Sequence, residues 1–157
     1  MESKSFRKSW GAEYEAADTV RFRLWAPGQQ TIALRIDGED RKMNAAGEGW
    51  FELLAQNIAP GTEYNFVLAD GMVVPDPAAR AQKAEVNGPS LVIDPAGYAW
   101  QNAWQGRPWE ESVVYEMHIG TFTPQGTFQA AIEKLPRLAQ LGITMIEVLP
   151  VAQFGGN

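Results

Sequence analysis

The chain contains no cysteine, and this absence excludes several kinds of site. Disulfide bonds, thiolate nucleophiles and cysteine-ligated zinc all require a thiol. The chain also has a single histidine among its 157 residues, and its carboxylates show no metal-ligand spacing. We therefore expect no metal and no cofactor. A composition without cysteine fits a reducing compartment, and we predict a cytoplasmic location.

Basic clusters and long apolar runs are missing as well. The formal net charge is -6, whereas nucleic-acid binding relies on clustered Lys and Arg. No stretch approaches the roughly 18 apolar residues of a membrane span, and the segment Met1–Trp10 lacks the apolar core of a signal peptide. We expect neither a nucleic-acid nor a membrane partner, and the acidic balance suits a neutral substrate.

The first part of the chain, up to about Asp94, alternates apolar and polar residues in short segments. Such segments, separated by turn dipeptides such as Asp37-Gly38 and Asp70-Gly71, predict an antiparallel β-sandwich over residues 1–94. In the segment Val20–Trp25, the Trp25 side chain falls on the face opposite Phe22 and Leu24. The alternating segments are Val20–Trp25, Ile32–Ile36, Trp50–Leu54 and Tyr64–Leu68.

Residues 95–112 show neither the helical nor the strand period and are interpreted as a connector. After Ser112 the pattern changes to strand, helix, strand. Apolar runs at Val113–Ile119 and Ile143–Leu149 predict two buried strands, and a loop is expected over Gly120–Gly126. The helix between them should begin at Thr127 as N-cap, be kinked or split by Pro136, and end at Gly142. The order predicts a βαβ unit of a parallel sheet.

Four segments resemble one enzyme family. Val114–Phe128 (VYEMHIGTFTPQGTF) and Leu141–Val151 (LGITMIEVLPV) resemble the first two barrel strands of malto-oligosyltrehalose trehalohydrolases, which are α-amylase superfamily enzymes of glycoside hydrolase family 13. Phe22–Pro27 (FRLWAP) and Pro75–Arg80 (PDPAAR) resemble the Ig-like early-set domain that precedes the barrel in this group.

The resemblance implies a mainly β fold in three parts. Residues 1–94 would form the Ig-like sandwich, 95–112 the connector, and 113–157 the incomplete start of a (β/α)8 barrel (strand 1, helix 1, strand 2). The full enzyme would release trehalose from maltooligosyl-trehalose by hydrolysing the adjacent α-1,4 bond with retention. Its partners would be α-glucan and the remainder of the barrel. The family's catalytic carboxylates have no matching positions here, so the chain alone is predicted to be inactive.

Two groups of residues are candidates for a site. Glu116, His118 and Glu147 lie on the predicted strands, and we interpret them as a structural polar cluster inside the barrel rather than as an acid/base pair. Thr121, Phe122, Thr123 and Pro124 follow the carboxyl end of the first strand, where barrel enzymes build their sites. We predict that this loop lies near the substrate.

Alternatives of a different class remain. The chain could be a non-catalytic module that binds α-glucan or packs against another domain, or the N-terminal part of a glycogen branching or debranching enzyme. The six tryptophans could stack on sugars, although filling the core or an interface is their commoner role. Two strands with one helix leave apolar surface open, so self-association of the chain is also expected.

Overall fold

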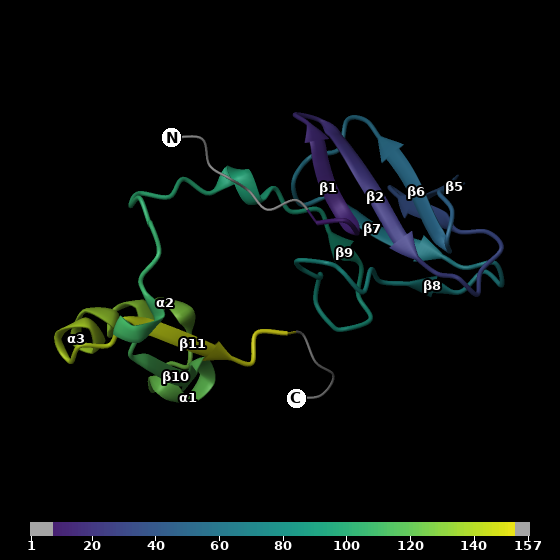
Figure 1. Ribbon diagram of the computed structural model, residues 1–157. Coiled ribbons are helices and arrows are strands. Elements are labelled where there is room, and N and C mark those ends of the chain that lie inside the picture. Colours follow the sequence, from purple (N-terminus) through teal and green to yellow (C-terminus); the bar gives the residue numbers. More distant parts are fainter. Residues whose placement is uncertain (1–7, 153–157) are drawn as a thin grey trace. The chain divides into compact units, whose positions relative to one another are not determined.

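The computed structural model describes residues 8–152, which fall into two compact units, 8–99 and 100–152 (Figure 1). Within the described range, no helix has the length and apolar character needed to cross a membrane.

The first unit contains two antiparallel sheets. The first sheet has the strand order β1-β2-β6-β5, with β2 (Thr19–Trp25) paired to β1 on one side and to β6 on the other (Figure 1). Burial alternates along β2, because Val20, Phe22 and Leu24 face the core while Trp25 is exposed. The predicted strand and the outward face of Trp25 are confirmed. The other strands are β1 (Gly11–Ala16), β5 (Asn44–Ala45) and β6 (Trp50–Ala55).

The second sheet has the order β4-β3-β7-β8, with β9 also paired to β7. The hairpin from β3 to β4 turns at Asp37 and Gly38, whose φ angles are +53° and +79°. Two consecutive positive φ angles are typical of the type I′ turn that an Asp-Gly pair favours. The strands are β3 (Ala33–Ile36), β4 (Glu39–Lys42), β7 (Glu63–Val67), β8 (Val73–Val74) and β9 (Ser90–Leu91).

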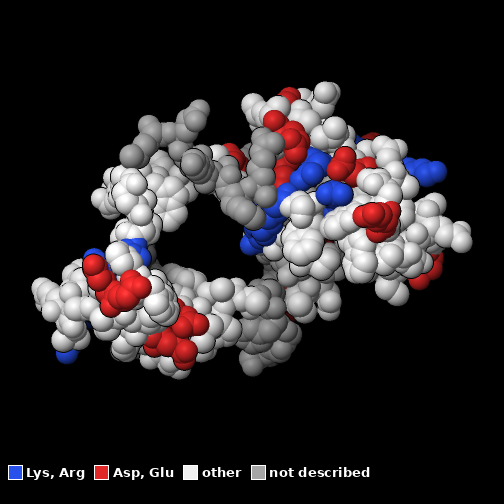
Figure 2. Space-filling model, in the orientation of Figure 1, with Lys and Arg blue, Asp and Glu red and all other residues white. Residues whose placement is uncertain are grey.

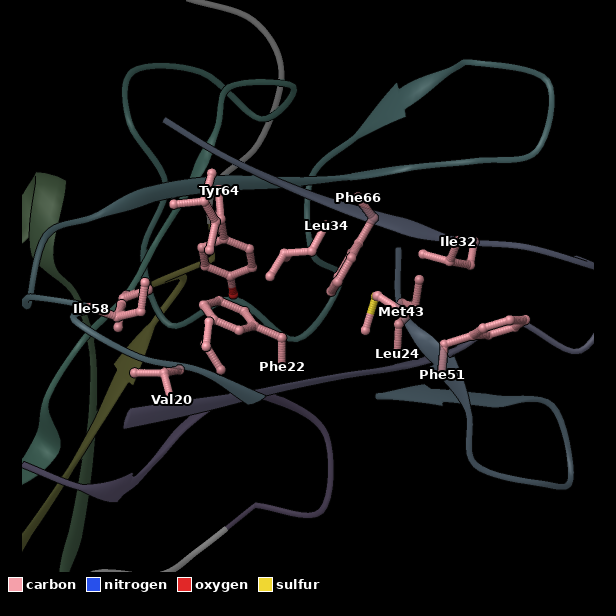
Figure 3. Close-up of a cluster of buried hydrophobic side chains, with 14 residues drawn as sticks. Val20, Phe22, Leu24, Ile32, Leu34, Met43, Phe51, Ile58, Tyr64 and Phe66 are labelled. Atoms are coloured by element: carbon pink, nitrogen blue, oxygen red, sulfur yellow. The ribbon is translucent and has the colours of Figure 1, made fainter. Parts of the chain in front are cut away.

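The core lies between the two sheets (Figure 3). Phe22 from β2 meets Tyr64 from β7 edge to face, with ring centroids 4.9 Å apart, and Tyr64 meets Phe66 in the same manner at 6.0 Å. Edge-to-face pairs add to the stabilisation that burying apolar area already gives. Two antiparallel sheets enclosing one core confirm the predicted β-sandwich.

The sequence pattern did not predict β1, because one of its buried positions carries a charge. Ala12 and Glu13 are both buried, and the Glu13 carboxylate accepts a hydrogen bond from Arg80 Nη2 at 2.6 Å. Arg80 Nη1 also donates to the Ala12 carbonyl at 3.2 Å. A buried carboxylate is tolerated only when it is paired in this way. This pair joins β1 to the segment that follows β8.

A second buried polar group lies at Asp76, which is 3% exposed. Its carboxylate accepts hydrogen bonds from the Tyr64 hydroxyl at 2.7 Å and from the Ala78 backbone N–H at 2.7 Å. Its own N–H donates to Ser90 Oγ at 2.8 Å. Asp76 thus connects the end of β8 to β7 and β9 and holds the Pro-rich segment against the sandwich.

The turn before β6 is tightly packed at Gly49. This residue has a φ of +81°, and a Cβ atom placed on it would lie 2.6 Å from Cβ of Pro27. The Ala26 N–H donates to the Gly49 carbonyl at 2.8 Å, which fixes the two segments together. Only glycine satisfies both the backbone angle and the contact. The ends of β2 and β6 are aligned as a result.

The second unit contains two parallel strands, β10 (Val114–His118) and β11 (Met145–Leu149), with three short helices between them (Figure 1). The βαβ prediction is confirmed. Met117 and Val148 share a small apolar cluster with Ile119, Ala131 and Leu135. The helices are α1 (Ile119–Phe122), α2 (Phe128–Ile132) and α3 (Leu135–Gln140).

Three details of the predicted helix are confirmed. Thr127 Oγ1 accepts a hydrogen bond from the Ala130 N–H at 3.2 Å and is the N-cap. The helix is split before Pro136, which lies in the first turn of α3, where no N–H is needed. Gly142 has a φ of +87°, as expected for a left-handed helix stop.

The segment predicted as a connector is irregular except for two 3-10 turns, η1 (Pro95–Gly97) and η2 (Trp109–Glu111). The division between the two compact units falls inside it, after Ala99. Trp104 and Trp109 are 71% and 72% exposed. The limits 95–112 stay a prediction.

We predict that the 157-residue chain self-associates through the second unit. Val114, Met145 and Ile146 are exposed on the strand pair, and a two-stranded parallel sheet has open edges on both sides. The double variant Val114→Lys/Ile146→Lys should lower the associated fraction in sedimentation velocity, whereas Met72→Lys, also at an exposed apolar residue but in the first unit, should not. A monodisperse monomer of the parent chain would contradict this expectation.

Candidate functional site

His118 and the segment Thr121–Pro124 lie at one edge of the second unit. Because β10 and β11 are parallel, their carboxyl ends meet at the same edge, where His118 is paired in register with Leu149. The segments that follow the two strands, from Ile119 and from Pro150, leave from this edge. Side chains from both segments can therefore contribute to one site.

The three polar strand residues share one side of the strand pair. Glu116 and Glu147 are register partners, and His118 lies two residues after Glu116, so all three are on the face opposite the buried Met117. All three are exposed. Within residues 8–152 no hydrogen bond or ion pair joins them to one another, and no group of three potential metal ligands is found. Their interpretation as an inner polar cluster stays a prediction.

The register has an electrostatic consequence. Two carboxylates at paired positions of neighbouring strands repel each other when both are ionised. A cation or a hydrogen-bond donor placed over this face would relieve the repulsion between Glu116 and Glu147. The face is thus suited to contact donors such as Arg, Lys or hydroxyl groups.

The predicted loop differs from the observed structure. Gly120 to Phe122 belong to the short helix α1, and the irregular segment is limited to Thr123–Gly126. The expectation of a loop from Gly120 onward was wrong, because Thr121 Oγ1 donates to the His118 carbonyl at 3.3 Å and supports one helical turn there. Pro124 then prevents continuation of the helix.

The four predicted loop residues divide into two pairs. Phe122 packs edge to face on Tyr115, with ring centroids 6.1 Å apart. Thr123 is 5% exposed, and its hydroxyl accepts a hydrogen bond from the Gly126 N–H at 3.2 Å. Thr121 and Pro124 are exposed. Phe122 and Thr123 therefore hold the segment in place, while Thr121, whose hydroxyl also bonds to the His118 carbonyl, and Pro124 are exposed to a ligand.

Glycine at position 120 leaves room for the imidazole of His118. A Cβ atom on Gly120 would lie 3.0 Å from Cε1 and 3.3 Å from Nδ1 of His118. Any larger residue would push the imidazole away from its place at the strand end. This contact could not be predicted from the sequence, because it depends on the turn that α1 makes after β10.

Tryptophans form a second candidate surface, in the first unit. Trp25 on β2 is paired in register with Trp50 on β6, and the ring of Trp10 lies 6.4 Å from that of Trp50. The alternation pattern placed Trp25 outward but gave no signal that Trp10 and Trp50 would join it. That grouping depends on the pairing of β2 with β6.

Charges of both signs are mixed on the first unit. Figure 2 shows Lys and Arg side chains beside Asp and Glu on one of its faces. In the first unit Arg21 and Arg23 lie 3.9 Å and 3.6 Å from Glu52, and Arg21 also pairs with Glu15 at 3.4 Å. These basic groups are therefore compensated, which disfavours a polyanionic ligand.

Known proteins share this sequence and fold, although no family profile matches the chain. A malto-oligosyltrehalose trehalohydrolase from Deinococcus radiodurans is 45% identical over 139 residues, which cover 88% of this chain and 23% of that protein. A 1,4-alpha-glucan branching enzyme from Streptomyces avermitilis is 36% identical over 158 residues, covering 88% of this chain and 26% of that protein.

One solved structure matches the fold of almost the whole chain. A protein from Salmonella typhimurium that is named as an alpha amylase has 68% sequence identity and a TM-score of 0.89, covering 96% of this chain and 26% of that one. The chain thus spans about a quarter of the length of the relatives it matches. The matches extend over both units, so both are shared with these relatives.

Proposed function

We propose that this chain, which resembles the N-terminal portion of malto-oligosyltrehalose trehalohydrolases, is part of an enzyme that releases trehalose from maltooligosyl-trehalose by hydrolysing the adjacent α-1,4 bond. The observation that carries the proposal is the 45% identity to such an enzyme across both units in the same order. In this proposal residues 1–94 are the Ig-like sandwich, 95–112 the connector and 113–157 the start of the catalytic barrel.

The chemistry would come from carboxylates outside this chain. Retaining glycosidases use two carboxyl groups about 5–5.5 Å apart, one as nucleophile and one as acid and base. What this chain would supply is the beginning of the barrel wall, through β10 and β11, whose exposed apolar side chains need cover from further strands and helices. We propose that Glu116, His118 and Glu147 face the inside of that barrel and orient neighbouring polar groups.

The segment Thr121–Pro124 would then lie at the rim of the substrate site. Its support comes from its position after the carboxyl end of β10, where barrel enzymes place their functional loops. Of its four residues, Thr121 and Pro124 are the exposed ones. Phe122 and Thr123 would act indirectly, by fixing the segment through the Tyr115 ring and the Gly126 N–H.

Product analysis of the enzyme that includes this chain tests the function. Incubated with maltotriosyl-trehalose, it should release trehalose and maltotriose in equal amounts, whereas the 157-residue chain alone should release neither. Chromatographic separation of the products is the measurement. An intact enzyme that cleaves maltooligosaccharides but leaves the bond next to trehalose untouched would refute the trehalose-specific part of the proposal.

A pair of variants in that enzyme tests the rim. Thr121→Ala should lower kcat/KM for maltotriosyl-trehalose by about tenfold, since one polar contact to substrate is worth about 1.4 kcal/mol. Gln125→Ala, at an exposed neighbouring position, should leave it within twofold. Equal effects of both changes would count against a substrate contact at Thr121.

A branching enzyme is a second candidate, because one of the relatives carries that activity in its name. Branching transfers a glucan segment and creates α-1,6 bonds, so amylose would lose its iodine colour without a matching rise in reducing ends. A hydrolase instead produces one new reducing end for every α-1,4 bond that it cleaves, also when the other product is trehalose. A non-catalytic glucan-binding role for the chain remains a further alternative.

On composition alone we propose a cytoplasmic location.

A further inference from the structure

Residues 81–91, which we call the closed loop, lead into β9 and contain the one Asn-Gly pair of the sequence, Asn87-Gly88. The main chain bonds to itself twice across this loop, at 2.9 Å in both places. The two bonds run from the Leu91 N–H to the Ala81 carbonyl and from the Lys83 N–H to the Pro89 carbonyl. The Asn-Gly pair is therefore held in a compact turn of the first unit.

An asparagine that precedes glycine can lose its side-chain amide in an intramolecular reaction, because glycine has no Cβ to hinder the approach of its nitrogen. The backbone nitrogen of Gly88 gives up its proton and forms a bond to Cγ of Asn87, while the side-chain nitrogen takes up a proton and leaves as ammonia. One water molecule then opens the resulting succinimide ring. Breaking the Cγ–N bond gives aspartate, whereas breaking the original peptide C–N bond gives isoaspartate, in which the main chain runs through Cγ. Water enters and ammonia leaves, with no change of oxidation state.

The packing of the closed loop keeps both members of this pair in place. Asn87 is exposed and lines an open hollow of about 500 Å³, so water reaches its side chain. A Cβ atom on Gly88 would lie 2.0 Å from the carbonyl oxygen of Lys83. Any side chain at position 88 would slow the attack on Cγ, but the Lys83 carbonyl leaves no room for one. The fold thus requires the glycine that makes Asn87 reactive.

One hydrogen bond of the folded loop slows the reaction. The Gly88 N–H donates to the Glu85 carbonyl at 2.8 Å and closes a four-residue turn. The nitrogen cannot attack while it keeps this proton in the bond, so the turn has to open first. Because Glu85 and Asn87 are both exposed, the turn can open locally while the sandwich stays folded. Deamidation should therefore take place in the folded chain, more slowly than in the unfolded one.

The closed loop has no slack to absorb an isoaspartate, which adds one atom to the main chain. Ala84 already has a φ of +66°, in the left-handed region that residues with a Cβ rarely adopt. Gly88 lies against the Lys83 carbonyl, so it cannot move inward. The extra atom should therefore separate the Lys83 N–H from the Pro89 carbonyl and open the loop at this point.

We propose that Asn87 is a site of spontaneous deamidation and that its isoaspartate product opens the closed loop. The exposed amide, the glycine that the packing requires and the turn between them carry the proposal, which is independent of the proposed function. Each event turns a neutral amide into a carboxylate and so adds one negative charge to the formal net charge of -6. The chain thereby carries a chemical record of its age.

Ageing of the 157-residue chain at mildly alkaline pH tests the site. Ion-exchange chromatography should resolve a growing acidic species, and fragment-ion mass spectrometry should locate the lost amide at Asn87, with both aspartate and isoaspartate present. Asn102, which is also exposed but precedes alanine, is the internal control and should keep its amide. Asn87→Gln, whose longer side chain would have to close a six-membered ring, should not form the acidic species in the same time. In urea the parent should react about tenfold faster, because the Glu85 carbonyl no longer holds the Gly88 N–H.

Several results would overturn the assignment of the site. An Asn87 amide that survives as long as that of Asn102 is one, and an acidic species that forms in Asn87→Gln at the parent's rate is another, since it would place the reaction elsewhere. Aspartate without isoaspartate would overturn the succinimide route. Equal rates in urea and in buffer would overturn the role of the turn hydrogen bond.

Amide hydrogen exchange tests the opening of the loop. In the aged, isoaspartate-containing chain the Lys83 N–H should lose its protection, while the Leu91 N–H at the base of the loop keeps it. Asn87→Asp carries the new charge on an unaltered main chain and should protect Lys83 as the parent does. Equal loss of protection in Asn87→Asp would overturn the effect of main-chain length, and full protection of Lys83 in the aged chain would overturn the opening itself.

Discussion

Replacing Phe22 by alanine is expected to lower the free energy of unfolding of the sandwich by about 4 kcal/mol. The Phe22 side chain is fully buried and lies edge to face against Tyr64 at 4.9 Å (Figure 3). Its removal loses the transfer free energy of a ring and leaves a cavity between the two sheets. For a unit of this size the loss corresponds to a fall in Tm of about 20 °C. Thermal unfolding followed by far-UV circular dichroism measures it.

Leu54→Ala is the matched control for this experiment. Leu54 lies on β6 in the same sheet, but its side chain is 58% exposed. The substitution should therefore change the free energy of unfolding by less than about 0.5 kcal/mol, as surface changes usually do. Similar destabilisation by the two variants would mean that the core does not lie on the face of the sheet that Phe22 occupies.

Removal of the Asp76 carboxylate should have the second largest effect. Asp76→Ala leaves the buried Tyr64 hydroxyl and the Ala78 N–H without their acceptor, and unsatisfied buried donors should destabilise the sandwich by about 3 kcal/mol in total. Urea unfolding measures the change. Because Tyr64→Phe removes one donor of the same network, the double variant should be less destabilised than the sum of the two single variants. Strict additivity would contradict a shared network.

The same carboxylate gives an expected pH dependence. Burial raises the pKa of Asp76 above its ordinary value of 3.8, although the Tyr64 hydroxyl, the Ala78 N–H and the charge of Lys8 act in the opposite direction. Between the unfolded and folded pKa values the folded state binds more protons, so stability falls as the pH rises through this window. Asp76→Asn cannot ionise. The free energy of unfolding of Asp76→Asn relative to that of the parent chain should therefore increase as the pH rises from 3.8 through that window. If the difference between the two free energies did not change with pH, this reasoning would be contradicted.

The alternation of apolar residues was sufficient to predict the central strands. Val20, Phe22 and Leu24 occupy every second position, and only a strand places such positions on one face. Local signals also predicted the helix cap at Thr127 and the stop at Gly142, since both depend on one residue and its neighbours. These features are encoded within a few residues of sequence.

Features that depend on distant residues could not be predicted. β1 has a buried carboxylate at Glu13, and the Arg80 that pairs with it lies 67 residues further along the chain. Likewise, the grouping of Trp10 with Trp50 follows from the order of strands in the sheet. At the candidate site, the sequence located Thr121 and Pro124 after the strand, but the packing of Phe122 on Tyr115 required the turn of α1.

The contact between Gly49 and Pro27 has a consequence for engineering of the chain. The backbone at Gly49 lies so close to Pro27 that no space remains for even one methyl group. A peptide tag inserted between residues 48 and 49 would push these two segments apart. The turns at Gly38 and Gly71 are different, because no atom lies within 4 Å of a Cβ placed on either. An affinity tag or a fluorescent reporter can therefore be carried at these two turns, and the permissive points of the sandwich are the hairpins that project away from it.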